Sequence, residues 1–477
     1  MTPTATITAT AAATDVFTAP ALEQALVPWL PGQRWFDGTG RTLSRVHVTG
    51  CHLFAAPDGP DHVSGAHLVV RAEDTVGADA GSYHLVLGAR PTTGTPPGPA
   101  LAVVGDTAVY DALTDPGLVR ALLLHMASGT TADGVRFGSE PPGFELSGTS
   151  LTVRPLQAEQ SNSSVIINDQ YILKIFRRYV PGASPDLVLH RMLRDQGSLH
   201  VPPLLGAAER HACTATLATL QRYLPKAEDG WAAALASVRS ELVGQPADDA
   251  GDFTHDSHAL GHALALVHRD LARAAGEEPL RAAEYHHLSE LFLRRLTHAL
   301  DQAPRLAPYA GQLHEVFSAV RHIEPAAHRS AHLVHGDLHL GQTLRTSEGW
   351  LLLDFEGEPL AARAERTARH SPLRDVAAML RSYDYAAHHE LTDTSRAGGE
   401  HIRALGWVRR NQGAFLSGYH ETVGAPGHAD DAALLTAYEL DKAVYEVLYD
   451  TRHRPDWAWI PLRALERALA PRGLPAG

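Results

Sequence analysis

The chain has 477 residues, of which 44% are hydrophobic and 20% charged, and its formal net charge is −13. Such a composition is that of a globular protein, and the length corresponds to roughly two to four structural units. The negative charge argues against a nucleic acid or an anionic membrane surface as the main partner. It does not exclude a nucleotide, because a local basic cradle with a metal ion can hold phosphates in an acidic protein.

The first residues, 1–20, are rich in Thr and Ala and lack the basic start and apolar core of a signal peptide. We therefore expect a disordered N-terminus there. The two cysteines, Cys51 and Cys213, have no metal-binding spacing, which favours a reducing cytoplasm. No apolar run approaches ~18 residues, so we expect no transmembrane helix.

Residues 21–105 are predicted to form a small β-rich unit. A short amphipathic helix over Ala21–Leu30 ends at a Pro-Gly pair. Short alternating segments broken by Gly, Pro or Asp follow, and they are typical of strands. The strand candidates in this unit are Arg45–His52, His67–Arg71 and Tyr83–Arg90.

Residues 106–224 are predicted to form a second unit of mixed structure. A helical stripe lies within residues 110–128, where Asp115 or Thr114 can cap the helix and Pro116 suits its first turn. A second helix is predicted from Ser184, with Asp186 in its first turn. The strand candidates are Phe144–Leu146, Ser150–Pro155, Ser164–Ile167, Tyr171–Phe176 and Thr216–Leu224, with a hairpin turn at Asn168-Asp169.

Residues 225–477 are predicted to be almost entirely helical. A β-rich first half followed by a helical second half indicates the α+β class. The exception is Leu333–Glu358, LVHGDLHLGQTLRTSEGWLLLDFEGE, where two apolar runs flank a polar turn. We predict a strand, a catalytic turn and a hairpin for this stretch.

Two acids and one amide in this stretch have the spacing that kinase-like phosphotransferases use. Asp337 is followed five residues later by Gln342, and Asp354 precedes a phenylalanine. In a phosphotransferase, Asp337 would orient the acceptor hydroxyl and accept its proton. Gln342 and Asp354 offer the hard oxygen ligands that Mg²⁺ prefers, and Glu356 can add a further carboxylate. Solvated acids on an ordinary hairpin are the alternative.

Lys174 lies inside an apolar strand, where an unmatched charge is expensive. It would either reach solvent from a strand edge or contact nucleotide phosphates. The polar turn upstream, residues 157–164 with Ser161, Asn162 and Ser163, could lay hydroxyls and backbone N–H groups over those phosphates. No Glu occurs between Gln160 and Glu209. Either Asp186 therefore pairs with Lys174, or this lysine has no helix carboxylate.

Three further positions are predicted with an alternative for each. Gln221 and Tyr223 would present backbone to an adenine if the strand over Thr216–Leu224 joins two lobes; otherwise it is a core strand. Asp375 could hydrogen-bond the catalytic loop, or simply begin a helix. Lys442, Tyr445 and Tyr449 share a helical face that could hold a sugar ring, although a tyrosine stripe more often belongs to the core.

With these residues in view, the chain resembles the actinobacterial maltokinases, within the wider group of aminoglycoside phosphotransferases and eukaryotic-like kinases. HGDLHLGQ at 335–342 together with DFEGEP at 354–359 is the most specific match. Further matches extend from about residue 27 to residue 465. They include RWF at 34–36, EQSNS at 159–163, ILKIFRR at 172–178, AEDGW at 227–231, SPLRD at 371–375 and YEVLY at 445–449.

The resemblance implies a bilobal kinase fold with an N-terminal cap, and ATP-dependent phosphorylation of maltose at its anomeric hydroxyl for α-glucan synthesis. It implies that Asp337 is the base, that Gln342 and Asp354 hold Mg²⁺ and that Lys174 meets the nucleotide phosphates. Lys442, Tyr445 and Tyr449 would lie on the sugar side, and we place His335 and Glu356 there too. The carboxylate that the family carries on the following helix appears here as Val188.

Other functions stay open at this point. A related branch phosphorylates glucosamine, so the acceptor could be an amino sugar. A pseudokinase-like module that binds nucleotide or sugar without turnover is the alternative from another class, and the missing helix carboxylate is the only feature that favours it. We expect a monomer.

Overall fold

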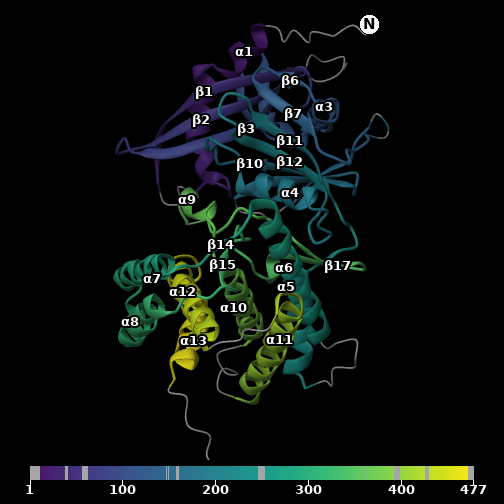
Figure 1. Cartoon of the computed structure of the whole chain (residues 1–477). Helices are drawn as coiled ribbons and strands as arrows, with labels where there is room; N and C mark the ends of the chain where they lie inside the picture. The colour runs from purple at the N-terminus through teal and green to yellow at the C-terminus, as the bar shows by residue number, and fades with distance from the viewer. Residues whose placement is uncertain are drawn as a thin grey trace, which may run out of the picture. The chain divides into compact units, whose positions relative to one another are not determined.

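The computed structural model describes residues 11–37, 41–55, 63–146, 148, 150–156, 161–244, 253–359, 361–391, 398–424 and 429–470. These residues form two compact units, the first made of Met1–Val188 and Pro202–Pro225 and the second of Leu189–Val201 and Lys226–Gly477. Figure 1 shows the elements of each unit. No helix in the described ranges is both long and apolar enough to cross a membrane.

The first unit begins with two short helices, α1 (Ala11–Phe17) and α2 (Pro20–Trp29). Phe17, Leu22 and Leu26 are fully buried in one core. The expectation of disorder over residues 1–20 is therefore wrong for residues 11–20, because an apolar helix face packs there. Residues 1–10 lie outside the described residues.

A five-stranded antiparallel sheet with the order β1-β2-β3-β5-β4 follows. The three strand predictions of the β-rich unit all fall within its first three strands. The boundary we placed at residue 105 falls inside the β4–β5 hairpin, because β5 pairs with β3 as well as with β4. The strands are β1 (Leu43–Ala55), β2 (Ser64–Asp74), β3 (Asp79–Pro91), β4 (Ala100–Val104) and β5 (Thr107–Asp111).

The second sheet of this unit has seven strands in the order β6-β7-β11-β12-β10-β9-β8. Its strands are β6 (Thr131–Ala132), β7 (Val135–Ser139), β8 (Val153–Leu156), β9 (Asn162–Ile167), β10 (Tyr171–Phe176), β11 (Leu204–Arg210) and β12 (Thr216–Arg222). Asn168 and Asp169 both have positive φ, the conformation of the predicted two-residue hairpin. Phe144–Leu146 is not a strand, although Phe144 and Leu146 pack on the sheet core.

Backbone hydrogen bonds join the two sheets of the first unit. The N–H of His84 donates to the carbonyl of Arg177 at 2.7 Å, and the N–H of Tyr179 donates to Ser82 at 2.9 Å. Helix α3 (Pro116–Ser128) packs in a core that contains side chains from both sheets. Of the two predicted caps, Asp115 caps the helix by accepting from the backbone of Gly117 and Leu118. The two sheets thus share a core rather than being connected only by a linker.

The second unit is mainly helical, as predicted. Its helices of eight residues or more are α5 (Gly230–Leu242), α6 (Phe253–Ala275), α7 (Ala282–Gln302), α8 (Ala310–Ala319), α10 (Leu373–His389), α11 (Gly399–Val423), α12 (Ala429–His453) and α13 (Trp459–Leu469). Helix α4 (Pro185–Asp195) is shared by the two units. Helices α6 and α11 touch at Gly261 and Gly418, where a Cβ on either glycine would overlap backbone of the other helix.

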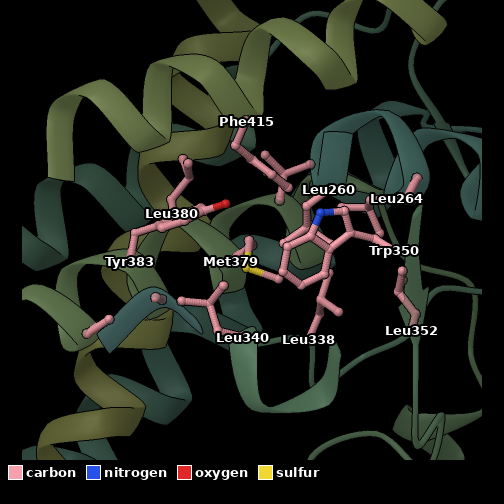
Figure 2. Close-up of a cluster of buried hydrophobic side chains, with 14 of the residues drawn as sticks. Leu260, Leu264, Leu338, Leu340, Trp350, Leu352, Met379, Leu380, Tyr383 and Phe415 are labelled. Carbon is pink, nitrogen blue, oxygen red and sulfur yellow. The ribbon is translucent and has the colours of Figure 1, made fainter. Parts of the chain in front are cut away.

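A buried hydrophobic cluster of this unit anchors the residues around Asp337. Figure 2 shows Leu338 and Leu340 from the loop together with Trp350 and Leu352 from β17 (Gly349–Leu352). Leu338, Leu340 and Leu352 are completely buried. They pack against side chains of α6, α10 and α11 such as Leu260, Met379 and Phe415. The core therefore holds the loop that follows Asp337.

Candidate active site

The stretch over Leu333–Glu358 forms a loop and a hairpin. Strands β16 (Thr343–Thr346) and β17 pair antiparallel, which confirms the predicted hairpin. The predicted strand before Asp337 is wrong, since only Ser330–Ala331 is extended there, as the two-residue β15. The N–H of Leu353 donates to the carbonyl of Gln342 at 2.9 Å. This bond brings Gln342 next to the residue that precedes Asp354.

Asp375 at the start of α10 holds the loop that carries Asp337. Its Oδ2 accepts from the N–H of His335 at 2.7 Å, and its Oδ1 accepts from Gly336 at 2.9 Å. Asp375 is fully buried, and although burial raises the pKa of a carboxyl, hydrogen bonding to His268 keeps this pKa well below its usual range. Asp375 therefore hydrogen-bonds the catalytic loop, which is the first of the two roles considered from the sequence.

A buried hydrogen-bonded chain continues behind Asp375. His268 Nε2 lies 3.0 Å from Asp375 Oδ2, and His268 Nδ1 lies 2.9 Å from the hydroxyl of Tyr419. His268 is thereby placed to donate an N–H to Asp375, with its other ring nitrogen against the Tyr419 hydroxyl. All three side chains are buried, so the chain fixes the orientation of the carboxylate.

His335 does not lie on the sugar side. Its side chain is 1% exposed, its Nε2 is 2.7 Å from the carbonyl of Leu353, and its ring packs on Phe355 at 4.6 Å between centroids. The backbone N–H of Asp337 points to the other ring nitrogen at 3.4 Å. We therefore correct the substrate role given to His335: it ties the Asp337 loop to the strand end before Asp354.

Lys442 of α12 bridges Asp337 and a second carboxylate. Its Nζ lies 3.2 Å from Oδ1 of Asp337 and 2.7 Å from Oε1 of Glu358. Burial alone would lower the pKa of Lys442, but Glu358 and Asp337 hold it above its ordinary value. The lysine therefore stays charged beside the candidate base.

Glu358 belongs to a buried network of alternating charges. Its Oε2 accepts from Arg374 at 3.2 Å. Burial raises the pKa of this carboxyl, yet Lys442, Arg374 and Arg295 together lower it to about 2. Arg295 in turn pairs with Glu365 and, at 2.5 Å, with Asp441. The carboxylate of Glu358 is thus held ionised by three cations.

The backbone at Asp354 has an unusual conformation. It has φ +56°, a left-handed conformation that a non-glycine residue adopts only when its surroundings impose it. An oxygen of its carboxylate lies within 4.8 Å of one from Glu356. Two oxygen donors at this separation fit a divalent cation, and Gln342 is brought to the same loop end by its backbone.

Tyr445 and Tyr449 lie on the face of α12 that carries Lys442. The ammonium of Lys442 is 4.7 Å from the centre of the Tyr445 ring, and the two tyrosine rings are nearly parallel with centroids 6.2 Å apart. Both are half-buried, whereas Tyr438 on the same helix is buried in the core. Tyr438 therefore belongs to the core, whereas Tyr445 and Tyr449 remain partly accessible beside Lys442.

In the first unit, Lys174 on β10 has a helix carboxylate. Its Nζ lies 3.4 Å from Oδ2 of Asp186, and both side chains are largely buried. Asp186, in the first turn of α4, therefore supplies the carboxylate partner of Lys174 that is absent at Val188. This pair removes the only sequence feature that favoured a non-catalytic module.

The polar residues predicted to contact the nucleotide phosphates lie at the start of β9. Asn162 and Ser163 begin β9, Asn162 donates to the hydroxyl of Ser161 at 3.3 Å, and Ser163 accepts from Arg177 at 2.8 Å. Residues 157–160 of the predicted phosphate turn lie outside the described residues.

Gln221 and Tyr223 lie at the end of β12, within the predicted strand region. Gln221 itself is paired on both sides within the sheet. The backbone N–H groups of Arg222 and Tyr223 donate to Pro203 and Gln170. Gln170 accepts from the N–H of Tyr223, and the predicted backbone contact of Gln221 and Tyr223 with an adenine stays a prediction.

Sequence reasoning gave no role to Glu358, Arg374, Arg295 or Asp441. Glu358 stands inside the DFEGEP motif, so its position was visible, but its partners come from three different helices. Only the packing of those helices brings the charges together.

Comparison with known proteins gives two family matches. Residues 29–115 match the maltokinase N-terminal cap domain, and residues 152–410, more than half of the chain, match the phosphotransferase enzyme family. The chain belongs to the phosphotransferase enzyme family. The resemblance inferred from the sequence motifs is confirmed, and this phosphotransferase carries the cap domain in addition.

Relatives of this phosphotransferase include two glucosamine kinases. The protein from Streptacidiphilus jiangxiensis is 30% identical over 333 residues, covering 67% of this chain and 74% of the relative. That from Mycolicibacterium smegmatis is 27% identical over 374 residues, covering 74% and 88%.

The fold also matches that of a solved kinase. A glucosamine kinase in complex with glucosamine, ADP and inorganic phosphate has a TM-score of 0.65 and 22% identity, covering 94% of this chain and 99% of that one. The predicted α+β, kinase-like fold is confirmed.

Proposed function

We propose that this phosphotransferase is an ATP-dependent sugar kinase. Lys174, ion-paired with Asp186 at 3.4 Å, would contact the nucleotide phosphates, with Ser161, Asn162 and Ser163 on the neighbouring strand start. Asp354 and Gln342 would hold Mg²⁺, which neutralises phosphate charge when bound. The observation that carries the sugar assignment is the contact of Lys442 with Asp337 beside the paired tyrosines.

In the proposed reaction, Asp337 orients one hydroxyl of the sugar. The hydroxyl oxygen forms a bond to the γ-phosphorus, the bond from that phosphorus to the β–γ bridging oxygen breaks, and the hydroxyl proton passes to Asp337. Asp375 contributes by fixing the backbone before Asp337, and Lys442 holds the Asp337 carboxylate through their ion pair. Catalysis on this account is positioning plus electrostatics.

Maltose is our first candidate for the acceptor, phosphorylated at its anomeric hydroxyl to maltose 1-phosphate for α-glucan or glycogen synthesis. The cap-domain match supports it. The charged Lys442 also favours a neutral sugar, because an amino sugar bound at Asp337 would bring its ammonium close to that of Lys442. Tyr445 and Tyr449 offer ring faces of the kind on which sugars pack.

Glucosamine is the second candidate, and the two relatives that are glucosamine kinases favour it. Its ammonium could be matched by carboxylates such as Glu356, which stands two residues after Asp354.

The two acceptors are separated by an ADP-release assay with ATP and Mg²⁺ in the presence of maltose, glucosamine or no sugar. Maltose-dependent ADP with product phosphorylated at the anomeric carbon is the expected result. Turnover with glucosamine alone would replace maltose by the amino sugar. Absence of any sugar-dependent ADP release would contradict the kinase assignment.

A further inference from the structure

The two tyrosines beside Lys442 are the start of a longer row of rings in the second unit. After Tyr449, the guanidinium carbon of Arg454 lies 5.3 Å from the Tyr449 ring centre and 5.1 Å from that of Trp457. The Trp457 ring is 4.7 Å from His389, and His389 is 5.7 Å from Trp231. Each member contacts the next without a break.

The row is assembled from separate parts of the chain. Tyr445 and Tyr449 come from α12, Trp457 from the short turn after it, His389 from the last turn of α10 and Trp231 from the first turn of α5. The α10 end is tied to α5, since Glu390 binds Arg239 through two bonds of 2.9 and 3.0 Å and also contacts His389 at 3.1 Å. The far end of the row is thereby held in place.

These rings differ from core aromatic residues in their exposure. Trp231, Trp457 and Tyr449 are half-buried, the side chain of His389 is 27% exposed, and Arg454 is exposed. In contrast, Trp350 and Trp407 of the same unit are 2% exposed. A row of half-buried rings therefore leaves apolar area at the surface that internal packing does not use.

Polar groups accompany the row at its start. The hydroxyl of Tyr385 donates to Asp450, and Glu446 accepts from Arg381 at 2.8 and 3.0 Å. Both carboxylates are taken up by these partners, which fix α12 against α10 beneath the rings. Half-buried rings and an exposed guanidinium suit a ligand that has flat apolar faces and many hydroxyls.

We propose that the acceptor site extends along this row, with Arg454, Trp457, His389 and Trp231 taking further hexose units of a neutral oligosaccharide. The reducing-end unit of the sugar chain lies at Asp337, and the units beyond the second pack on Trp457 and its neighbours. The proposal rests on the proposed sugar-kinase function. It makes oligosaccharides longer than a disaccharide substrates of the same site.

The test compares kcat/KM for maltose, maltotriose and maltotetraose in the native enzyme and in Trp457→Ala. The native enzyme is expected to use the longer sugars at least as well as maltose. Trp457→Ala is expected to lower the ratio of kcat/KM for maltotriose to that for maltose by roughly three- to tenfold, the size of one aromatic contact. The exposed His286→Ala, outside the row, serves as the control and should leave the ratio unchanged.

Thermal unfolding of each variant shows whether it is folded. Trp457→Phe keeps a ring at this position and should restore part of the ratio. Equal losses for both sugars, or an unchanged ratio in a folded Trp457→Ala variant, would overturn the proposal. So would rejection of maltotriose by a native enzyme that turns over maltose or glucosamine. A native enzyme without any sugar-dependent ADP release would instead contradict the kinase function itself.

Discussion

Lys442 Nζ lies 3.2 Å from Oδ1 of Asp337, although the two residues are 105 positions apart in the chain. The same ammonium is 2.7 Å from Glu358, so one cation serves both the candidate base and a buried carboxylate. Methionine has a similar length without the charge. We expect Lys442→Met to lower kcat/KM for the sugar by about ten- to a hundredfold, the range of one or two charge-assisted hydrogen bonds.

The measurement for Lys442→Met is steady-state kinetics with the sugar varied at saturating ATP, paired with a nucleotide-binding titration. Nucleotide affinity should stay close to that of the native enzyme. A sugar kcat/KM within twofold of the native value would show that the Lys442–Asp337 contact has no part in turnover.

Asp337→Asn is expected to remove turnover while leaving nucleotide binding largely intact. The amide preserves the shape of the side chain but cannot accept the hydroxyl proton, and loss of a general base lowers rates by about 10²- to 10⁴-fold. Comparing kcat with the dissociation constant for ATP separates the two effects. Near-normal kcat in this variant would exclude Asp337 as the base.

Tyr445→Ala and Tyr449→Ala are each expected to raise the KM for the sugar more than the KM for ATP. The reason is that their half-buried rings lie next to Lys442, away from the core. Tyr438→Ala on the same helix is the matched control, because that ring is buried and its loss should lower the melting temperature. A larger change in the KM for ATP would mean that the two tyrosines act through the fold.

Local motifs explain why part of this site could be predicted from sequence. The hairpin after Asp337 and the Asn168-Asp169 turn depend on a few neighbouring residues, and both are found where expected. Strand β11, Leu204–Arg210, was missed because its glycine and two alanines carry little strand preference. Its position between β7 and β12 is decided by pairing partners that are distant in sequence.

The charge network around Glu358 could not be predicted for the same reason. Arg374, Arg295 and Lys442 each sit on a different helix, and none has a spacing that links it to Glu358. The error on His335 has the opposite origin. Its motif is local and correct, but motif spacing does not tell which way a side chain points, and this ring turns inward to Leu353 and Phe355.

The chain from Tyr419 through His268 to Asp375 is expected to control kcat. Tyr419→Phe removes the hydroxyl that lies 2.9 Å from His268 Nδ1, while Asp375→Asn replaces one acceptor of the loop backbone. We expect a loss of kcat of roughly threefold for the first and ten- to a hundredfold for the second, with little change in either KM, because neither residue meets a substrate.

His268→Gln tests whether hydrogen bonding through this side chain positions the loop that carries Asp337. Glutamine can donate to Asp375 and accept from Tyr419, so it should retain more activity than His268→Ala. If the glutamine and alanine variants have the same kcat at the same melting temperature, hydrogen bonding through His268 is not what positions the loop.

A buried histidine pair predicts that the first unit is sensitive to acid. His67 Nδ1 lies 2.9 Å from His84 Nε2, and both rings are almost fully buried. Burial lowers the pKa of both, that of His84 to about 3, and the neighbouring His52, His125 and Arg177 act in the same direction. The pair therefore remains unprotonated in the folded state when the unfolded chain binds protons.

The sign of the pH effect follows from that difference in proton binding. Below pH 6.5 the unfolded state takes up protons that the folded pair refuses, so stability falls as the pH decreases from 6.5 towards 3. Each proton of difference changes the free energy of unfolding by about 1.4 kcal/mol per pH unit. The ionised Glu358 and Asp375 lose their stabilising effect only as the pH falls through their own lowered pKa values. Burial also lowers the pKa of His332 and raises the pKa of Glu439 and Asp441, so these groups titrate in the same range. The contribution of the His67–His84 pair is therefore read from variants of that pair.

Thermal unfolding between pH 7.5 and 4.5 checks this expectation. The double variant His67→Phe/His84→Phe keeps aromatic rings in both places and should flatten the dependence of melting temperature on pH. His211→Gln, an exposed histidine in the same unit, is the control and should retain the native slope. An identical slope in the native protein and the double variant would mean that other groups cause the acid sensitivity.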